Sequence, residues 1–217
     1  MKEKILSILK DINGLRRFVI MFYIIGAAGM LLPITSGLFI FLTPLALLMS
    51  FGLLMMHHQP GFITKDIAVF SFIFISGIVV ELIGVHTGLI FGNYSYGKGL
   101  GLKIFDTPIL IGMNWLLLVY TTGTIMQKVN IFPVLRIAAG ASIMLIYDLV
   151  LEQVAPKMDM WSWENSEVPV NNYIAWWLIA VFFHSLIELF GIKLKNPLSI
   201  TILVTQFLFF VVLYLFL

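Results

Sequence analysis

The feature that most constrains this chain is a series of long apolar runs separated by short polar segments. A helix that crosses the hydrocarbon layer of a membrane needs about 20 mainly apolar residues. The bilayer offers the backbone no hydrogen-bond partners, so such runs must fold as helices. Seven runs fit, at residues 18–32, 38–56, 68–91, 109–126, 132–154, 173–189 and 198–217. The predicted fold class is therefore all-α, a polytopic membrane helix bundle with about seven transmembrane helices.

Composition supports this prediction and limits the alternatives. Hydrophobic residues fill 60% of the 217 positions and charged residues only 11%, whereas soluble domains carry about 25% charged residues. We expect a single integral membrane domain, with residues 18–217 as the transmembrane bundle and residues 1–17 as an interfacial amphipathic helix. The first two runs have a re-entrant pair as their alternative, and Pro44 predicts a kink in the second. No cleavable signal peptide is evident.

Lysine and arginine predict the orientation, because they concentrate in cytoplasmic loops. With the N-terminus inside, ten of the 13 basic residues fall on the cytoplasmic side. Only Lys98, Lys103 and Lys157 fall outside. The N-terminus is thus predicted to be cytoplasmic in a multi-pass protein of the cell (inner) membrane. Two polar, aromatic segments, residues 92–108 and 156–173, then lie together on the outer side.

Glu81 lies inside an apolar run, where a charge costs at least about 3 kcal/mol and marks a functional residue by default. It is followed at helical spacing by Gly84, Gly88 and Gly92. Small residues on one face let a neighbouring helix approach closely. We therefore predict that Glu81 faces protein, where it either carries chemistry or forms a structural hydrogen bond.

Asp148 and Glu152 lie four residues apart in another run and so share one helix face. Two carboxyls that close together in a low-dielectric site disfavour double ionisation. A carboxylic acid that keeps its proton near neutral pH is what a general acid requires. Asp148, Glu152 and Glu81 are the predicted catalytic residues, although the sequence does not order their roles. A pair that anchors the adjoining loop is the alternative interpretation.

Aromatic residues gather near the same predicted membrane face. An aromatic belt should populate both interfaces, but all five tryptophans lie near this one. Their ring faces can stabilise a developing cation, or they can simply anchor the helices. For His86 a structural role is favoured. The residues predicted to bind substrate are His86, Tyr94, Tyr96, Asn114, Trp115, Trp163, Asn171 and Trp176.

A second group of polar residues is expected at the inner end of the bundle, formed by His57, His58, His184 and Glu188. Four histidines are too few for a histidine-rich di-iron site, and we predict no metal here, with a single metal ion as the minor alternative. A hydrogen bond between His184 and Glu188 that braces the bundle is favoured. Arg136 is expected to extend towards the interface.

The order of rare residues resembles one known family. The resemblance covers residues 81–177, nearly half of the chain. In this region the chain is similar to the carotenoid biosynthesis membrane proteins, which include the CruF-type carotenoid 1,2-hydratases and the bisanhydrobacterioruberin hydratases. The matching residues are the run from Glu81 to Gly97 (ELIGVHTGLIFGNYSYG), Leu100-Gly101, Pro108, Asn114-Trp115, Asp148, Glu152, Trp161-Ser162-Trp163, the run from Val168 to Tyr173 (VPVNNY) and Trp176.

The resemblance implies hydration of the terminal 1,2 double bond of an acyclic carotenoid end group, a carbon–oxygen lyase reaction without a cofactor. The expected partners are the carotenoid substrate, membrane lipid and other enzymes of the carotenoid pathway, with no nucleic acid. A proton-coupled transporter or lipid-handling protein is the alternative, since buried carboxyls suit it equally. The inverted repeats common in transporters are not visible. A non-catalytic assembly factor is a further alternative, but it leaves the buried acids without a role.

Overall fold

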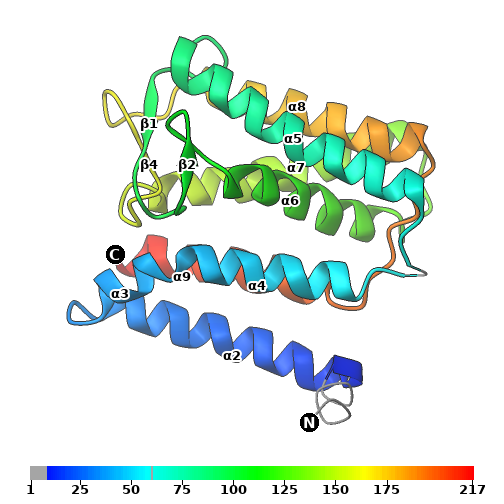
Figure 1. Cartoon of the computed structure of the whole chain (residues 1–217), viewed down its shortest axis with the longest axis horizontal. Coiled ribbons are helices and arrows are strands. Elements are labelled where there is room, and N and C mark those ends of the chain that lie inside the picture. Colours follow the sequence, from blue (N-terminus) through cyan, green and yellow to red (C-terminus); the bar gives the residue numbers. More distant parts are fainter. Residues whose placement is uncertain (1–8, 60) are drawn as a thin grey trace.

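The computed structural model describes residues 9–59 and 61–217, which form a bundle of antiparallel helices (Figure 1). Half of the predicted interfacial helix, residues 1–8, therefore lies outside the described residues. The helices are α2 (Ile12–Leu31), α3 (Ser36–Phe41), α4 (Thr43–Met56), α5 (Thr64–Thr87), α6 (Leu110–Met126), α7 (Pro133–Val154), α8 (Val170–Leu189) and α9 (Ser199–Phe216).

Five of these helices, α2, α5, α7, α8 and α9, are long and apolar enough to cross a membrane. The apolar helices α4 and α6 have 14 and 17 residues and are shorter. The single run predicted at residues 38–56 is divided at Leu42 into α3 and α4. Pro44 lies in the first turn of α4, where its missing N–H has no partner to lose. Pro44 thus lies at the beginning of a new helix, and the prediction of a kink inside one continuous helix was wrong.

Helix α5 ends earlier than predicted, at Thr87, because Gly88 adopts a left-handed conformation with φ of 64° and caps the helix. Gly92 follows in the loop with φ of 110°. Both glycines therefore allow turns, and the prediction that they continue a helix-packing face was wrong. Close packing occurs earlier in α5, where a Cβ added at Gly77 would lie 3.1 Å from Trp115 of α6.

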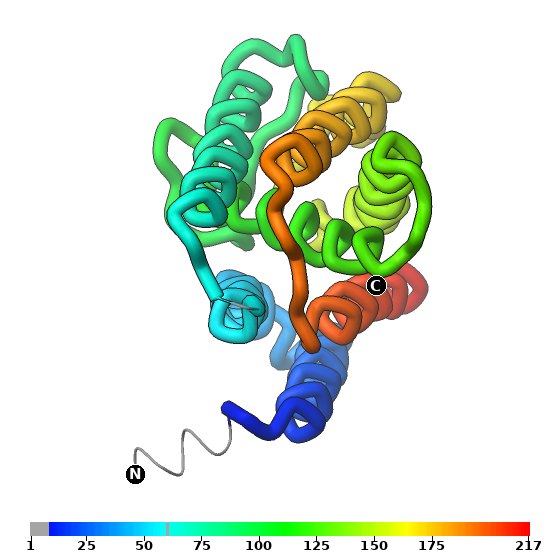
Figure 2. The backbone as a smooth tube through the Cα atoms, turned by 90° about the vertical axis from the view of Figure 1, so that its right-hand side faces the viewer, coloured from blue at the N-terminus to red at the C-terminus, as the bar shows by residue number. Residues whose placement is uncertain are grey.

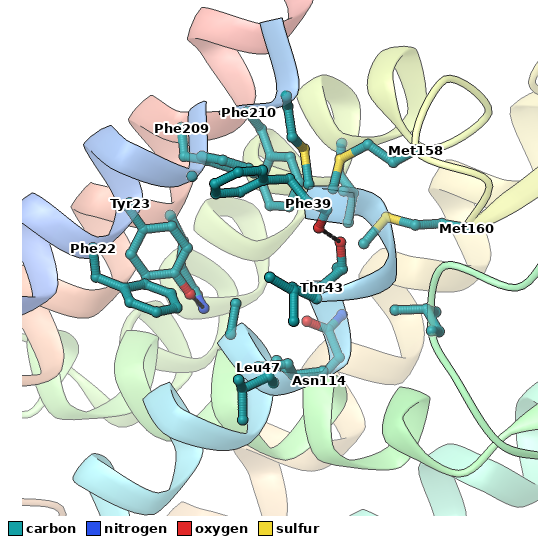
Figure 3. Close-up of a pocket in the computed structure, with 18 of the residues that line it drawn as sticks. Phe22, Tyr23, Phe39, Thr43, Leu47, Asn114, Met158, Met160, Phe209 and Phe210 are labelled. Carbon is teal, nitrogen blue, oxygen red and sulfur yellow. Dashed lines mark hydrogen bonds between the residues drawn. The ribbon is translucent and has the colours of Figure 1, made fainter. Parts of the chain in front are cut away.

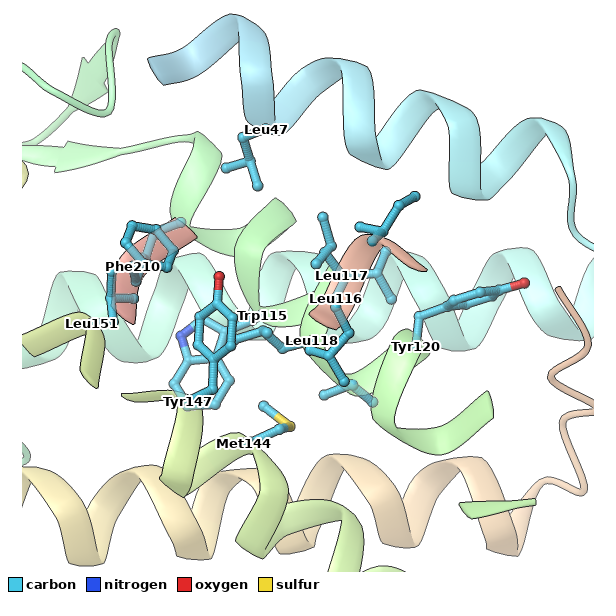
Figure 4. Close-up of a cluster of buried hydrophobic side chains, with 14 of the residues drawn as sticks. Leu47, Trp115, Leu116, Leu117, Leu118, Tyr120, Met144, Tyr147, Leu151 and Phe210 are labelled. Atoms are coloured by element: carbon cyan, nitrogen blue, oxygen red, sulfur yellow. The ribbon is translucent and has the colours of Figure 1, made fainter. Parts of the chain in front are cut away.

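Helix α6 forms the centre of the bundle. It contacts α4, α5, α7, α8 and α9, and Figure 2 shows these helices around it. Every residue from Trp115 to Thr124 is buried, as expected for a helix that is surrounded on all sides. Figure 4 shows its leucines in one buried cluster with Met144 and Tyr147 of α7, and Leu47 of α4 on the facing side. In contrast, α2 lies at the edge and packs mainly on α9 and α3.

The two polar segments meet at one end of the bundle, here called the site end. Strand β1 (Tyr94–Tyr96) pairs antiparallel with β4 (Trp161–Trp163), so that Tyr94 lies opposite Trp163 and Tyr96 opposite Trp161. A separate hairpin joins β2 (Lys103–Ile104) to β3 (Thr107–Pro108). The predicted meeting of these loops is confirmed, and their pairing holds four aromatic rings over the ends of α5 and α7.

Candidate functional site

Glu81 is buried near the site end of α5, with 3% of its surface exposed. Its Oε2 accepts hydrogen bonds from the hydroxyls of Tyr94 and Tyr96, both at 2.7 Å. Its Oε1 accepts a hydrogen bond from the indole N–H of Trp115 at 2.9 Å. All three donors are neutral. The loop and α6 thus hold this carboxyl with hydrogen bonds in place of a counter-ion.

Tyr94 and Tyr96 lie on β1, outside the helices. Burial raises the pKa of both phenols well above the usual value, and the nearby Glu81 carboxyl raises it further. Both hydroxyls therefore keep their protons at physiological pH and act as donors. The rings contact each other edge to face, with centroids 5.5 Å apart. This packing limits where the two hydroxyls can point.

Glu152, near the end of α7, is held in a similar way. Its Oε2 accepts hydrogen bonds from the indole N–H groups of Trp161 and Trp163, at 2.9 and 2.8 Å. Its Oε1 accepts a hydrogen bond from the Asn172 amide of α8 at 2.9 Å. Strand β4 places both indoles over α7, because alternate residues of a strand point to the same face. The two indoles of the Trp-Ser-Trp sequence therefore hold the Glu152 carboxyl in place.

Asp148 lies one turn before Glu152 on the same face of α7 and is completely buried. Its Oδ2 accepts a hydrogen bond from Asn172 at 3.3 Å, so one amide bridges the two carboxyls. Within residues 9–59 and 61–217, nothing hydrogen-bonds Asp148 Oδ1. An unsatisfied buried polar atom costs about 1–3 kcal/mol. That oxygen is a place for the carboxyl's own proton, for water or for a ligand.

A small cavity separates Glu81 from Glu152. The space open to the centre of a water molecule is about 10 Å³, which is roughly the volume needed for a single water. The cavity therefore brings one water-sized site into reach of two carboxyls. Its lining residues are Glu81, Phe91, Tyr94, Tyr96, Ile111, Glu152, Trp161, Trp163, Asn172 and Trp176.

A larger apolar cavity, with about 170 Å³ open to the centre of a water molecule, lies beside it, between α2, α4, α6, α7 and α9. The two cavities share Ile111 and Trp161 as lining residues, so these side chains lie against both. In Figure 3 the aromatic rings of α2 line one side, and Met158 and Met160 line another. Ile25 of α2 and Leu45 of α4 also line the cavity but are mostly exposed on the outer surface. The wall of the cavity thus reaches the outer surface at these helices.

Most of the predicted site residues meet here, but not all of them. Trp176 stacks on Trp115, with ring centroids 3.9 Å apart. Asn114 lines the large cavity and does not contact the carboxyls. His86 and Asn171 are exposed and do not line the small cavity, and His86 hydrogen-bonds a loop carbonyl at 3.1 Å.

Two residues of the site, Asn172 and Trp161, were missed among the predicted binding residues. Asn172 is adjacent to Asn171, and Trp161 lies two positions before Trp163, and both of those neighbours were predicted to bind substrate. The Asn-Asn and Trp-Ser-Trp sequences were the available signals. Which asparagine points inward depends on where α8 begins, because successive residues of a helix point about 100° apart.

The predicted inner group is divided among several separate contacts. His58 bonds the Tyr120 hydroxyl at 2.8 Å, and His184 bonds Thr122 at 3.1 Å. Glu188 forms an ion pair with Arg136 at 3.0 Å, so the expected His184–Glu188 bond was wrong. In the described part of the chain, no three histidine or acidic side chains lie close enough to hold a metal ion.

Fold and site together define a membrane helix bundle whose buried carboxyls lie beside an apolar cavity. The chain belongs to the carotenoid biosynthesis protein family, whose model matches residues 38–217. It is 25% identical over 170 residues to the bisanhydrobacterioruberin hydratase of Haloarcula japonica. That match covers 72% of this chain and 50% of the relative, so the chain spans about half of its length. No solved structure matches. The protein therefore has a role in carotenoid biosynthesis.

Proposed function

We propose that this protein adds water to the terminal 1,2 double bond of an acyclic carotenoid end group. One observation carries the proposal: two buried carboxyls, Glu81 and Glu152, line a water-sized cavity, and an apolar cavity adjoins it. A third buried carboxyl, Asp148, lies one turn from Glu152, and all three have only neutral hydrogen-bond donors. Hydration of an alkene requires a proton donor, a water and an acceptor for the proton that the water loses. The carboxyls and the small cavity can supply all three at the end of an apolar chain.

We assign the proton donor to Asp148. Glu81 and Glu152 each accept three hydrogen bonds, and hydrogen bonds to a carboxylate favour its ionised form. Asp148 accepts only one long bond and leaves an oxygen unpaired, which suits a neutral carboxylic acid. Of the three, Asp148 is thus best suited to hold a proton for transfer.

The reaction begins when Asp148 gives its proton to C2, which leaves a tertiary cation at C1. Trp176 lines the small cavity with Trp115 stacked on it, and its ring can stabilise that charge. Water from the small cavity adds to C1 and gives a proton to Glu152. The substrate gains one water in total, and the proton inventory of the Asp148–Glu152 pair is unchanged.

The placement in the membrane is part of the proposal. The basic residues divide between the ends of the bundle, with Lys98, Lys103 and Lys157 in the loops of the site end. The remaining basic residues lie at or towards the other end, or in the N-terminal segment. This division supports seven spans with a cytoplasmic N-terminus in the cell (inner) membrane. An apolar substrate then reaches its cavity from the lipid, between α2 and α4.

The test is expression in a host that accumulates an acyclic carotenoid. The wild type should yield a carotenoid heavier by one water, with its oxygen taken from labelled water. Asp148→Asn and Glu152→Gln should each reduce product formation by about 100- to 10,000-fold, while the protein still accumulates in membranes. Glu167→Gln, on the exposed loop that follows β4, is the matched control and should retain activity.

Two results would contradict the proposal. Product oxygen that comes from oxygen gas would exclude hydration. Full activity in both carboxamide variants would move the chemistry away from α7.

A further inference from the structure

One polar side chain of the large cavity has no role in the reaction proposed above. Gln206, on α9, lines that cavity and is only 4% exposed. Its amide nitrogen donates a hydrogen bond to the Tyr23 hydroxyl at 2.7 Å. Among the described residues, its Oε1 has no hydrogen-bond partner. A carbonyl left unpaired in an apolar cavity is unfavourable, so this oxygen points to a ligand.

The Gln206 amide is fixed in place by its neighbours. Tyr23 of α2 also hydrogen-bonds the Ser50 hydroxyl of α4 at 2.8 Å, and Ser50 is completely buried. A chain of hydrogen bonds thus joins α9, α2 and α4 behind the cavity wall. These hydrogen bonds engage the amide nitrogen of Gln206 and leave its amide oxygen free. If the amide were turned over, a polar atom would still be left without a partner.

The rest of the cavity wall shows what kind of ligand fits. Most of its lining is apolar, including Phe209, Phe210 and Met158. Asn114 and Tyr147 add polar groups to the wall, and neither forms a side-chain hydrogen bond within residues 9–59 and 61–217. A pure hydrocarbon would leave these groups unpaired, and a carboxylate would bring no donor for Gln206. A hydroxyl can both donate and accept.

We propose that Gln206 is the centre of a binding site for a hydroxyl group carried by the carotenoid chain. This inference rests on the proposed function, and it narrows the substrate to acyclic carotenoids that already bear an alcohol. The hydroxyl donates to Gln206 Oε1, while the polyene fills the apolar part of the cavity. Tyr23 and Ser50 are positioning residues that hold the amide.

The experiment measures binding with the full chain in detergent micelles. Two ligands are used, an acyclic carotenoid with one tertiary hydroxyl and the matching hydrocarbon. Quenching of tryptophan fluorescence by the polyene gives a Kd for each. The wild type should bind the alcohol about 10-fold more tightly than the hydrocarbon. Gln206→Met, similar in length and unable to accept the bond, should remove the preference without weakening hydrocarbon binding.

Matched variants keep the test decisive. Gln153→Met, at an exposed position of α7, should retain the preference of the wild type. Tyr23→Phe removes the bond that holds the amide and should reduce the preference, which provides a second route if Gln206→Met does not fold. Equal binding of both ligands by the wild type would overturn the proposal, as would equal weakening of both by Gln206→Met.

Conversion is followed in the same samples, so that the two proposals fail separately. A wild type that binds the alcohol preferentially but adds no water supports the hydroxyl site and contradicts the hydratase function. A wild type that hydrates the hydrocarbon and the alcohol equally well, with equal Kd values, supports the hydratase function and overturns the hydroxyl site.

Discussion

Removing one of the two tyrosine hydroxyls that hydrogen-bond Glu81 tests the reasoning about the site most directly. Tyr96→Phe deletes a single donor, the 2.7 Å hydrogen bond to Glu81 Oε2, and keeps the buried ring. A hydrogen bond to a charged group contributes about 1.5–3 kcal/mol, and one between neutral groups about 0.5–1.5 kcal/mol. If Glu81 is ionised, the free energy of unfolding should fall by about 1.5–3 kcal/mol. The size of the loss thus reports the charge of Glu81.

The assay is a double-mutant cycle on the free energy of unfolding, measured by denaturant titration in mixed micelles. Glu81→Gln keeps an oxygen that can accept the Tyr96 bond but removes the charge. In that background, Tyr96→Phe should cost only about 0.5–1.5 kcal/mol, which leaves a coupling of roughly 1 kcal/mol. Tyr214→Phe, at a tyrosine that is 51% exposed, is the control and should change stability by less than about 0.5 kcal/mol.

Two outcomes would refute this reasoning. A loss below about 0.5 kcal/mol for Tyr96→Phe would mean that the bond contributes nothing to folding. An equal loss in both backgrounds would mean that Glu81 carries no charge for Tyr96 to stabilise. In the second case Glu81 would become a candidate proton donor, and the role proposed for Asp148 would be wrong.

Three further predictions concern packing, the carboxyl bridge and orientation. Gly84→Ala should lower the melting temperature, because its Cβ would lie 2.5 Å from the ring of a phenylalanine in the following loop. Gly52→Ala is the control, since its Cβ would meet nothing within 4 Å. Equal melting temperatures for the two variants would contradict this prediction. Asn172→Leu should reduce product formation about 10-fold or more, while Asn171→Leu, at the exposed neighbouring position, should not. A larger loss in Asn171→Leu than in Asn172→Leu would exclude a role for the amide that bridges Asp148 and Glu152. A reporter inserted within residues 98–106 should read external, and a cytoplasmic signal would invert the predicted topology.

The helices could be predicted from sequence because hydrophobicity is a local property. Burial in hydrocarbon requires intrahelical hydrogen bonds, so each apolar run predicted a helix near its observed place. The ends of helices depend on particular residues and were predicted less well. Gly88 ended α5 with a left-handed residue, and Pro44 began α4. Both residues were visible in the sequence, but a glycine or a proline is compatible with more than one local structure.

The candidate carboxyls were also identifiable from sequence, because a charge in an apolar run is costly wherever the chain places it. The spacing of Asp148 and Glu152 fixed their shared face. Their partners were harder to choose, since a helix that begins one residue earlier turns a different asparagine inward. Pro169 precedes the first residue of α8 and sets that phase, so Asn172 points to the carboxyls and Asn171 does not.

The sequence by itself determined that this is a helical membrane protein with buried carboxyls near one end of the bundle. Only the tertiary structure decided what surrounds those carboxyls. The bond between Trp115 and Glu81 spans 34 positions, and the pairing of β1 with β4 joins segments that are separated by two helices. Both cavities likewise depend on side chains from several helices. Such contacts depend on how whole helices pack together, and no local pattern of residues specifies that arrangement.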